Sequence, residues 1–123
     1  MTAITIYTDA SFANGAAGYA ALLITFFQNG RIDRFRVVSE AGTFDGSDQA
    51  EIAAAMLALR SLQGQHQIQI FSDSKSLVEI MTGMGTPRKN PGMIAELRSQ
   101  CEEHEICWQW VRGHDGAPYP VIS

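Results

Sequence analysis

Apolar residues in the first half of the chain follow patterns that are typical of β-strands. Polar and apolar positions alternate over residues 3–8 and 32–40, and a continuous apolar run covers residues 19–27. The Asn and Gly residues at 14–18 predict a loop between the first two segments, because both residue types tolerate positive φ. Asn29 and Gly30 predict a hairpin with a type I′ turn before the third segment. The first half is therefore expected to form an antiparallel meander.

The pattern changes to alternating helices and strands in the second half. Apolar residues at helical spacing predict helices at residues 48–62, 74–82 and 92–104, and strands are predicted at 67–72 and 106–111. Gly64 is expected to end the first helix. A meander followed by strand, helix and strand predicts an α/β fold. Its mixed five-stranded sheet would have an antiparallel half and a parallel half, with helices packed on it.

The composition fits one domain with a hydrophobic core, since the chain has 123 residues and 46% of them are hydrophobic. The net charge of −4 argues against a protein that is basic throughout, although a local basic patch can still bind nucleic acid. Cys101 and Cys107 lack the spacing of a zinc site, so we expect reduced thiols and a cytoplasmic protein. No apolar run is long enough to span a membrane, and the first residues do not resemble a signal peptide.

Three acidic residues lie where predicted elements begin or end. Asp9 follows the first alternating segment, Glu51 lies at the start of the first helix, and Asp73 ends the strand at 67–72. Such positions can converge at one edge of an open α/β sheet. Converging carboxylates repel one another unless cations lie between them, and Mg²⁺ prefers oxygen ligands. Together the three residues predict a magnesium site of the kind that works on phosphates.

Each of these residues also has an ordinary structural explanation. Asp9 is a common turn residue, and Asp73 would cap the helix that follows it. Glu51 would form a capping-box-like pair with Asp48 and interact with the positive end of the helix dipole. These explanations account for the residues singly, but not for the joint pattern.

Four sequence blocks resemble type 1 ribonuclease H, the family that cuts the RNA strand of an RNA–DNA hybrid. The blocks are YTDAS, NG and GYA within residues 7–20, QAEIAA at 49–54, FSDSKSLV at 71–78 and WQWVRGHDG at 108–116. They occur in the family's order and spacing over nearly the whole chain. One block alone is a weak signal, whereas four in order are specific. The resemblance implies a ribonuclease H-like fold in a single domain over residues 1–123.

The same resemblance implies a metal-dependent endonuclease that hydrolyses the RNA strand of a hybrid by a two-metal-ion mechanism. Asp9, Glu51 and Asp73 would bind two Mg²⁺ ions, for which Mn²⁺ is a substitute. His114, in a glycine loop, would relay a proton or help to release the product.

The RNA–DNA hybrid is the partner that the resemblance implies, with no membrane and no obligate protein partner. RNA is distinguished by its 2′-hydroxyls in a shallow minor groove. The polar positions that the family presents to this groove are here Asn14, Ser47, Asp48 and Gln49. The donors expected to contact phosphates of the DNA strand are Lys75, Arg88 and Lys89.

The chain departs from the family pattern at two places. Some relatives carry a long basic helical protrusion where this chain has only residues 83–91, which predicts weaker hybrid binding. The family's last helix opens with a fourth catalytic Asp ten residues after the histidine, which corresponds to position 124, whereas Ser123 is the last residue here. We therefore expect the domain to lack that helix and ligand, with a weaker second metal and a slower reaction.

Two alternatives remain open at this stage. The first is a catalytically weak or inactive module that still binds hybrids, and hydrolysis of a labelled hybrid would distinguish it. The second is an integrase-like DNA-processing domain of the same broad fold. The Gly-His-Asp-Gly loop at 113–116 and the Gln-Ala-Glu-Ile motif at 49–52 favour ribonuclease H over this second alternative.

Overall fold

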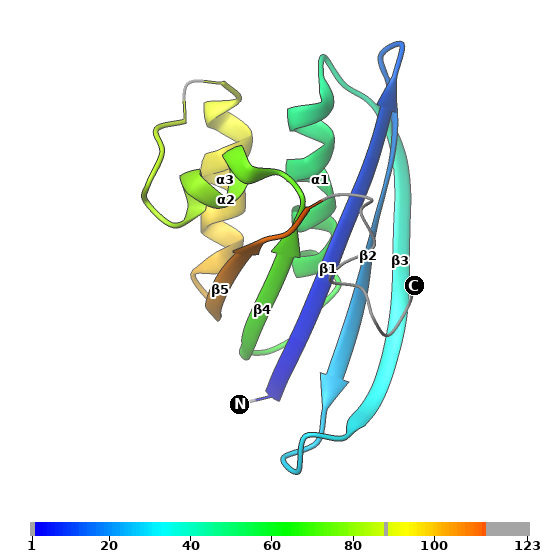
Figure 1. Cartoon of the computed structure of the whole chain (residues 1–123), viewed down its shortest axis with the longest axis vertical. Helices are drawn as coiled ribbons and strands as arrows, with labels where there is room; N and C mark the ends of the chain where they lie inside the picture. The colour runs from blue at the N-terminus through cyan, green and yellow to red at the C-terminus, as the bar shows by residue number, and fades with distance from the viewer. Residues whose placement is uncertain (1, 88, 113–123) are drawn as a thin grey trace.

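The computed structural model describes residues 2–87 and 89–112, which form five strands and three helices (Figure 1). In chain order these are β1 (Thr2–Ala13), β2 (Ala16–Phe26), β3 (Ile32–Thr43), α1 (Ser47–Arg60), β4 (His66–Ser72), α2 (Lys75–Met81), α3 (Pro91–Cys101) and β5 (Glu105–Trp110). The strand order in the sheet is β3-β2-β1-β4-β5. β1 and β3 run antiparallel to β2, whereas β4 runs parallel to both β1 and β5. The predicted mixed α/β sheet is therefore confirmed.

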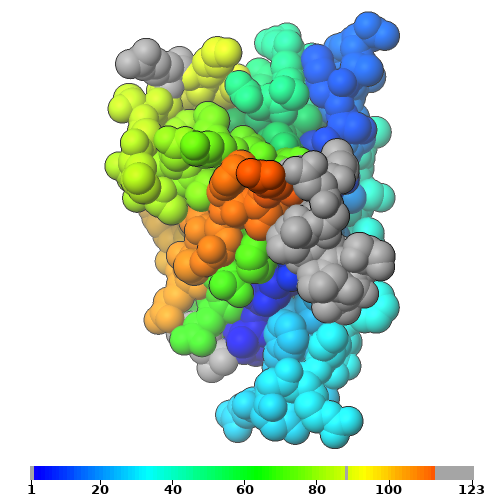
Figure 2. Space-filling model, viewed as in Figure 1, coloured from blue at the N-terminus to red at the C-terminus, as the bar shows by residue number. Residues whose placement is uncertain are grey.

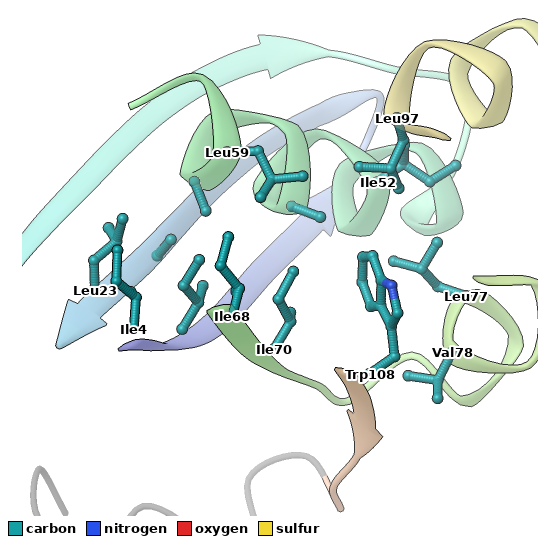
Figure 3. Close-up of a cluster of buried hydrophobic side chains, with 14 of the residues drawn as sticks. Ile4, Leu23, Ile52, Leu59, Ile68, Ile70, Leu77, Val78, Leu97 and Trp108 are labelled. Carbon is teal, nitrogen blue, oxygen red and sulfur yellow. The ribbon is translucent and has the colours of Figure 1, made fainter. Parts of the chain in front are cut away.

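The hydrophobic core lies between this sheet and the helices, as Figure 3 shows. Alternation along β1 buries Ile4 and Ile6, and the parallel partner β4 adds Ile68 and Ile70 at the same levels. The buried face of α1 is rich in alanine, and small side chains let the helix approach the sheet closely. Trp108 of β5 closes the end of the core near α2.

The remaining helices extend this layer beside α1, and α3 packs against it (Figure 1). Figure 2 shows the β2–β3 hairpin, in light blue, projecting at the lower end of the molecule. Within residues 2–87 and 89–112, no helix combines the length and the apolar character that crossing a membrane requires.

The two turns of the meander differ from the prediction. Asn14 and Gly15 alone connect β1 to β2, with φ values of 52° and 81°, and positive φ at both central residues is the type I′ requirement. At the second hairpin only Gly30 has positive φ, at 86°. The loop there is longer, and a hydrogen bond from the Phe27 N–H to the Arg31 carbonyl, at 2.8 Å, closes it. The type I′ prediction at Asn29 and Gly30 was therefore wrong.

The first helix also ends earlier than predicted. Its C-cap is Ser61, whose hydroxyl donates to the Leu57 carbonyl at 2.7 Å and whose N–H bonds to carbonyls of the last turn. These bonds satisfy carbonyls at the end of α1 without a glycine. Gly64, with φ of 81°, lies instead in the turn that leads to β4.

Candidate active site

The register of the parallel strands places two of the predicted acidic residues level with each other. Pairing between β1 and β4 runs as far as Tyr7 opposite Phe71, whose rings stack with centroids 4.9 Å apart. Two residues further along each chain are Asp9 and Asp73. Asp73 is the first residue beyond β4, while β1 continues to Ala13 as the partner of β2. The two carboxylates therefore lie where the strands separate.

The third acidic residue reaches this point from the first helix. Glu51 lies one turn inside α1, and α1 packs on both β1 and β2. Glu51 is half-buried, and its Oε1 atom is buried without a hydrogen-bond partner among the described residues. The same is true of Oδ1 of Asp73. Asp9 is exposed.

The electrostatics show that these carboxyl groups lie close to one another. The pKa of Glu51 is raised from 4.5 to about 9, mainly by burial and then by the neighbouring Asp73 carboxyl. The charges of Asp9 and Asp48 add to the effect. A carboxyl group that is desolvated and surrounded by other acids keeps its proton at neutral pH.

The ordinary explanations of the three acidic residues do not hold. Asp9 is paired with Ala20 in the middle of a ladder and is not in a turn. Ser74, not Asp73, caps α2, by accepting a hydrogen bond from the Leu77 N–H at 3.2 Å. Gly46 occupies the N-cap of α1, and no side chain completes a capping box there. Asp9 is therefore no turn residue, and neither Asp73 nor Glu51 provides the cap of a helix.

The donor set suits a hard divalent cation. As the side chains are placed, residues 2–87 and 89–112 contain no group of three His, Cys, Asp or Glu side chains that could hold a metal ion. Two buried carboxylate oxygens without partners are costly, and an oxygen-preferring cation satisfies such atoms. The oxygen donors of these residues are therefore of the type that a divalent cation prefers.

One residue that supports this site was not predicted from the sequence. The indole Nε1–H of Trp110 donates to the carbonyl oxygen of Asp73 at 3.3 Å. The next residue strengthens the link, because the Val111 N–H donates to the Ser72 carbonyl at 3.0 Å. The end of β5 thus holds the peptide that carries the Asp73 side chain. Pattern reasoning treats Trp110 as one residue of a strand and gives no signal for this contact.

The structure places the predicted substrate-binding residues on several elements. Asn14 lies in the β1–β2 turn, and Ser47 is the exposed first residue of α1. Asp48 is exposed and lies 4.0 Å from the Nζ atom of Lys89. Lys75 follows Asp73 by two residues, and its Nζ atom lies 5.6 Å from the centre of the Trp110 ring. Lys89 is therefore placed at the start of α1, and Lys75 is placed against the residue that bonds to the Asp73 carbonyl.

Gln49 has a structural role that the sequence did not indicate. Its Oε1 accepts a hydrogen bond from the Asp45 N–H at 2.8 Å, and its Nε2 donates to Oδ1 of Asn90 at 2.9 Å. Asn90 has a left-handed backbone with φ of 56° immediately before α3. The bond links the starts of α1 and α3. A cavity of about 240 Å³ lies beside it, lined by Asp48, Ser74, Leu77, Lys89 and Asn90 among others.

Some predicted features lie outside the described residues. They are His114 with its glycine loop, Arg88, and the expected departure from the family pattern at positions 120–123.

Comparison with known proteins gives consistent results at three levels. The RNase H family matches residues 1–120. The ribonuclease H of Xanthomonas campestris pv. campestris is 32% identical over 133 residues, which cover 96% of this chain and 85% of the relative. The ribonuclease HI of Synechocystis sp. is 29% identical, over 92% of this chain and 78% of the relative.

Solved structures show the same fold. LC11-RNase H1, isolated from compost, superposes with a TM-score of 0.68 at 19% identity, over 92% of this chain and 86% of that one. LC11-RNase H1 in complex with an RNA/DNA hybrid gives a TM-score of 0.64 at 18% identity, over 93% and 88%. The family match over residues 1–120, together with the Xanthomonas relative, shows that this chain belongs to the RNase H family.

Proposed function

We propose that this protein is a metal-dependent endonuclease that hydrolyses the RNA strand of RNA–DNA hybrids. The observation that carries the proposal is the crowding of Glu51, Asp73 and Asp9 at the point where β1 and β4 separate. A stable protein gains nothing from burying acids against one another, so perturbed groups of this kind point to function. Membership of the RNase H family supplies the substrate class.

Asp9, Glu51 and Asp73 are the residues that would hold Mg²⁺, two ions in the complete site, with Mn²⁺ as a substitute. Cations bound there supply positive charge that offsets the negative charge developing on the reacting phosphate. The chain's own contribution is to fix the ligands in place. β1 and α1 present Asp9 and Glu51 from rigid elements, and Trp110 holds the peptide of Asp73.

Polar groups around the carboxylates are suited to hold the two strands of the substrate. Asn14, Ser47 and Asp48 surround the start of α1 and would face the groove that carries the 2′-hydroxyls. Lys75 and Lys89 flank the same site, and we assign them to phosphates of the DNA strand, together with Arg88. Because the Gln49 side chain already bonds to Asp45 and Asn90, its contribution is to shape this surface.

We also place the protein in the cytoplasm. Cys101 and Cys107 are both free thiols, and disulfides are rare in reducing compartments. Burial raises the pKa of Cys101 to about 11, so this thiol stays protonated and inert.

The decisive experiment compares cleavage of a labelled RNA–DNA hybrid, a DNA duplex and single-stranded RNA, each with and without Mg²⁺. Asp73→Asn removes one ligand charge and keeps the shape of the side chain, so activity should fall by at least about a hundredfold. Asp33→Asn, on exposed β3, is the matched control and should cleave like the parent. Equal cleavage by Asp73→Asn would disprove the assignment of that residue. Hybrid binding without cleavage would identify a binding module, and cleavage of the DNA duplex would identify the integrase-like alternative.

A further inference from the structure

A second cavity lies at the end of the sheet that is remote from the carboxylates. It has a volume of about 450 Å³, within the range of small-molecule sites. Its wall comes from the first residues of β1 and β4, the β2–β3 pair and the loop that follows α1. These segments meet at the lower end of the molecule in Figure 1. The polar residues of the wall are Thr2, Thr25, Arg34, Arg36, Ser61, Gln63 and His66.

Two arginines of this wall stand side by side. Arg34 and Arg36 lie two residues apart on β3, opposite Thr25 and Leu23 of β2. Residues at this spacing point to the same face of a strand and lie about 7 Å apart. Arg36 donates from its guanidinium to the carbonyl of Ser61, which holds its head group over the loop after α1. The chain therefore places two positive charges on one wall of the cavity.

No acidic side chain of the described residues neutralises this pair. The ion pairs within residues 2–87 and 89–112 involve Arg60 with Glu40 and Lys89 with Asp48. The cavity wall contains no Asp or Glu. Two guanidinium groups held near each other repel, and an anion between them relieves the repulsion. In a chain whose net charge is −4, an unbalanced positive pair at a cavity is unexpected on composition alone.

The rest of the cavity is suited to the organic part of a ligand. Ile4 and Leu23 form part of the wall, and Figure 3 shows both at the opposite end of the core from Trp108. Leu62 extends this apolar surface. His66 adds a polar group, since its Nε2 lies 2.7 Å from the Gln63 carbonyl while its Nδ1 is buried without a partner among the described residues.

We propose that this cavity binds a small phosphorylated molecule of about the size of a nucleoside monophosphate. The phosphate would lie between Arg34 and Arg36, because guanidinium groups match phosphate oxygens with paired hydrogen bonds. The organic part would lie against Ile4, Leu23 and Leu62. The site shares no residue with the proposed catalytic cluster, so it stands independently of the proposed function.

Calorimetric titration of the whole protein tests this proposal. Adenosine monophosphate, inorganic phosphate and adenosine are the three probes, in a buffer with a metal chelator so that the catalytic carboxylates cannot hold a nucleotide through a cation. The double variant Arg34→Gln/Arg36→Gln removes both charges. Arg31→Gln, on the same hairpin but outside the cavity wall, is the matched control. Thermal melts confirm that each variant is folded.

We expect one saturable site for adenosine monophosphate, with affinity at least about tenfold weaker in the double variant and unchanged in Arg31→Gln. If inorganic phosphate binds as tightly as the nucleotide, the site is specific for the free anion, and the assigned role of the two arginines stands. Adenosine that binds as well as its phosphate would overturn the anion site. The absence of saturable binding at millimolar nucleotide, or equal binding by the double variant, would overturn the whole proposal.

Discussion

At the scale of single residues, the most unusual group in the molecule is the carboxyl of Glu51. Its pKa is raised from the usual 4.5 to about 9, first by burial and then by Asp73. An acid with a raised pKa binds its proton more tightly in the folded state than in the unfolded state. Its contribution to the stability of the fold is complete below the unfolded pKa, and it is lost as the pH rises to the folded pKa. The stability of the metal-free protein should therefore decline between about pH 4.5 and pH 9. Divalent cations should reverse this decline.

Glu51→Gln tests that reasoning, because it keeps the shape of the side chain and removes the titration. At pH 8 without metal, we expect the variant to be more stable by about 1–2 kcal/mol, or roughly 4–8 °C in Tm for a domain of this size. The gain should shrink as the pH falls toward 4.5, because well below that value Glu51 is protonated in both the folded and the unfolded state. Added Mg²⁺ should raise the Tm of the parent more than that of the variant. A variant less stable than the parent at pH 8 would show that the carboxylates are not crowded.

Trp110 gives a second prediction at this scale. Trp110→Phe keeps an aromatic ring but removes the donor to the Asp73 carbonyl. A hydrogen bond of this kind is worth about 0.5–1.5 kcal/mol, so half-saturation by Mg²⁺ should shift about two- to tenfold higher. The cleavage rate at saturating metal should change less, and the metal-induced rise in Tm reports the same shift without substrate.

Lys75→Met is the control for Trp110, since it removes the cation over the ring and leaves the indole donor in place. If Lys75→Met shifts the metal dependence as much as Trp110→Phe does, the cation and not the hydrogen bond supports Asp73.

At the scale of elements, the order of strands and helices was predictable from periodicity, whereas the ends of elements were not. β1 extends past Asp9 to Ala13 because its last residues pair with β2 as far as Ala16, and no local pattern reports that pairing. The sequence predicted that Asp9, Glu51 and Asp73 converge, but only Asp73 lies at a strand end, since β1 runs past Asp9 and Glu51 lies one turn inside α1. The contacts of Gln49 with Asn90 and of Trp110 with Asp73 join residues about 40 positions apart, and only the folded chain reveals them.

α2 gives a testable case of how an element end supports the site. Ser74 caps this helix directly after Asp73, and its own N–H bonds to the hydroxyl of Ser72 at 3.1 Å. Ser74→Ala should cost about 0.5–2 kcal/mol in the free energy of unfolding, since the Leu77 N–H loses its acceptor. Ser76→Ala, exposed inside the same helix, should be neutral or slightly stabilising. Urea unfolding measures both, and equal effects would mean that the cap contributes nothing.

At the scale of the whole molecule, charge governs how tightly a hybrid is held. The net charge is −4, and the segment between α2 and α3 carries only Arg88 and Lys89 as basic residues. Among the described residues, Lys75 and Lys89 are the cations that we assign to the DNA phosphates, and Lys89 is partly neutralised by Asp48. A protein with few phosphate contacts should bind hybrids weakly. Its affinity should still depend on salt, because each contact releases counterions.

Two phosphate contacts predict a loss of about tenfold in affinity between 50 and 200 mM salt, measured with a chelator to prevent cleavage. Lys89→Gln should weaken binding to hybrids of any sequence and lower the salt slope by roughly one contact. Arg31→Gln has the same change in charge on the distant β2–β3 hairpin, so it should leave the slope unaltered. An affinity that barely responds to salt would show that Lys75 and Lys89 do not contact the backbone. If Arg31→Gln lowered the slope as much as Lys89→Gln, the hybrid would be attracted by overall charge and not by residues beside the carboxylates.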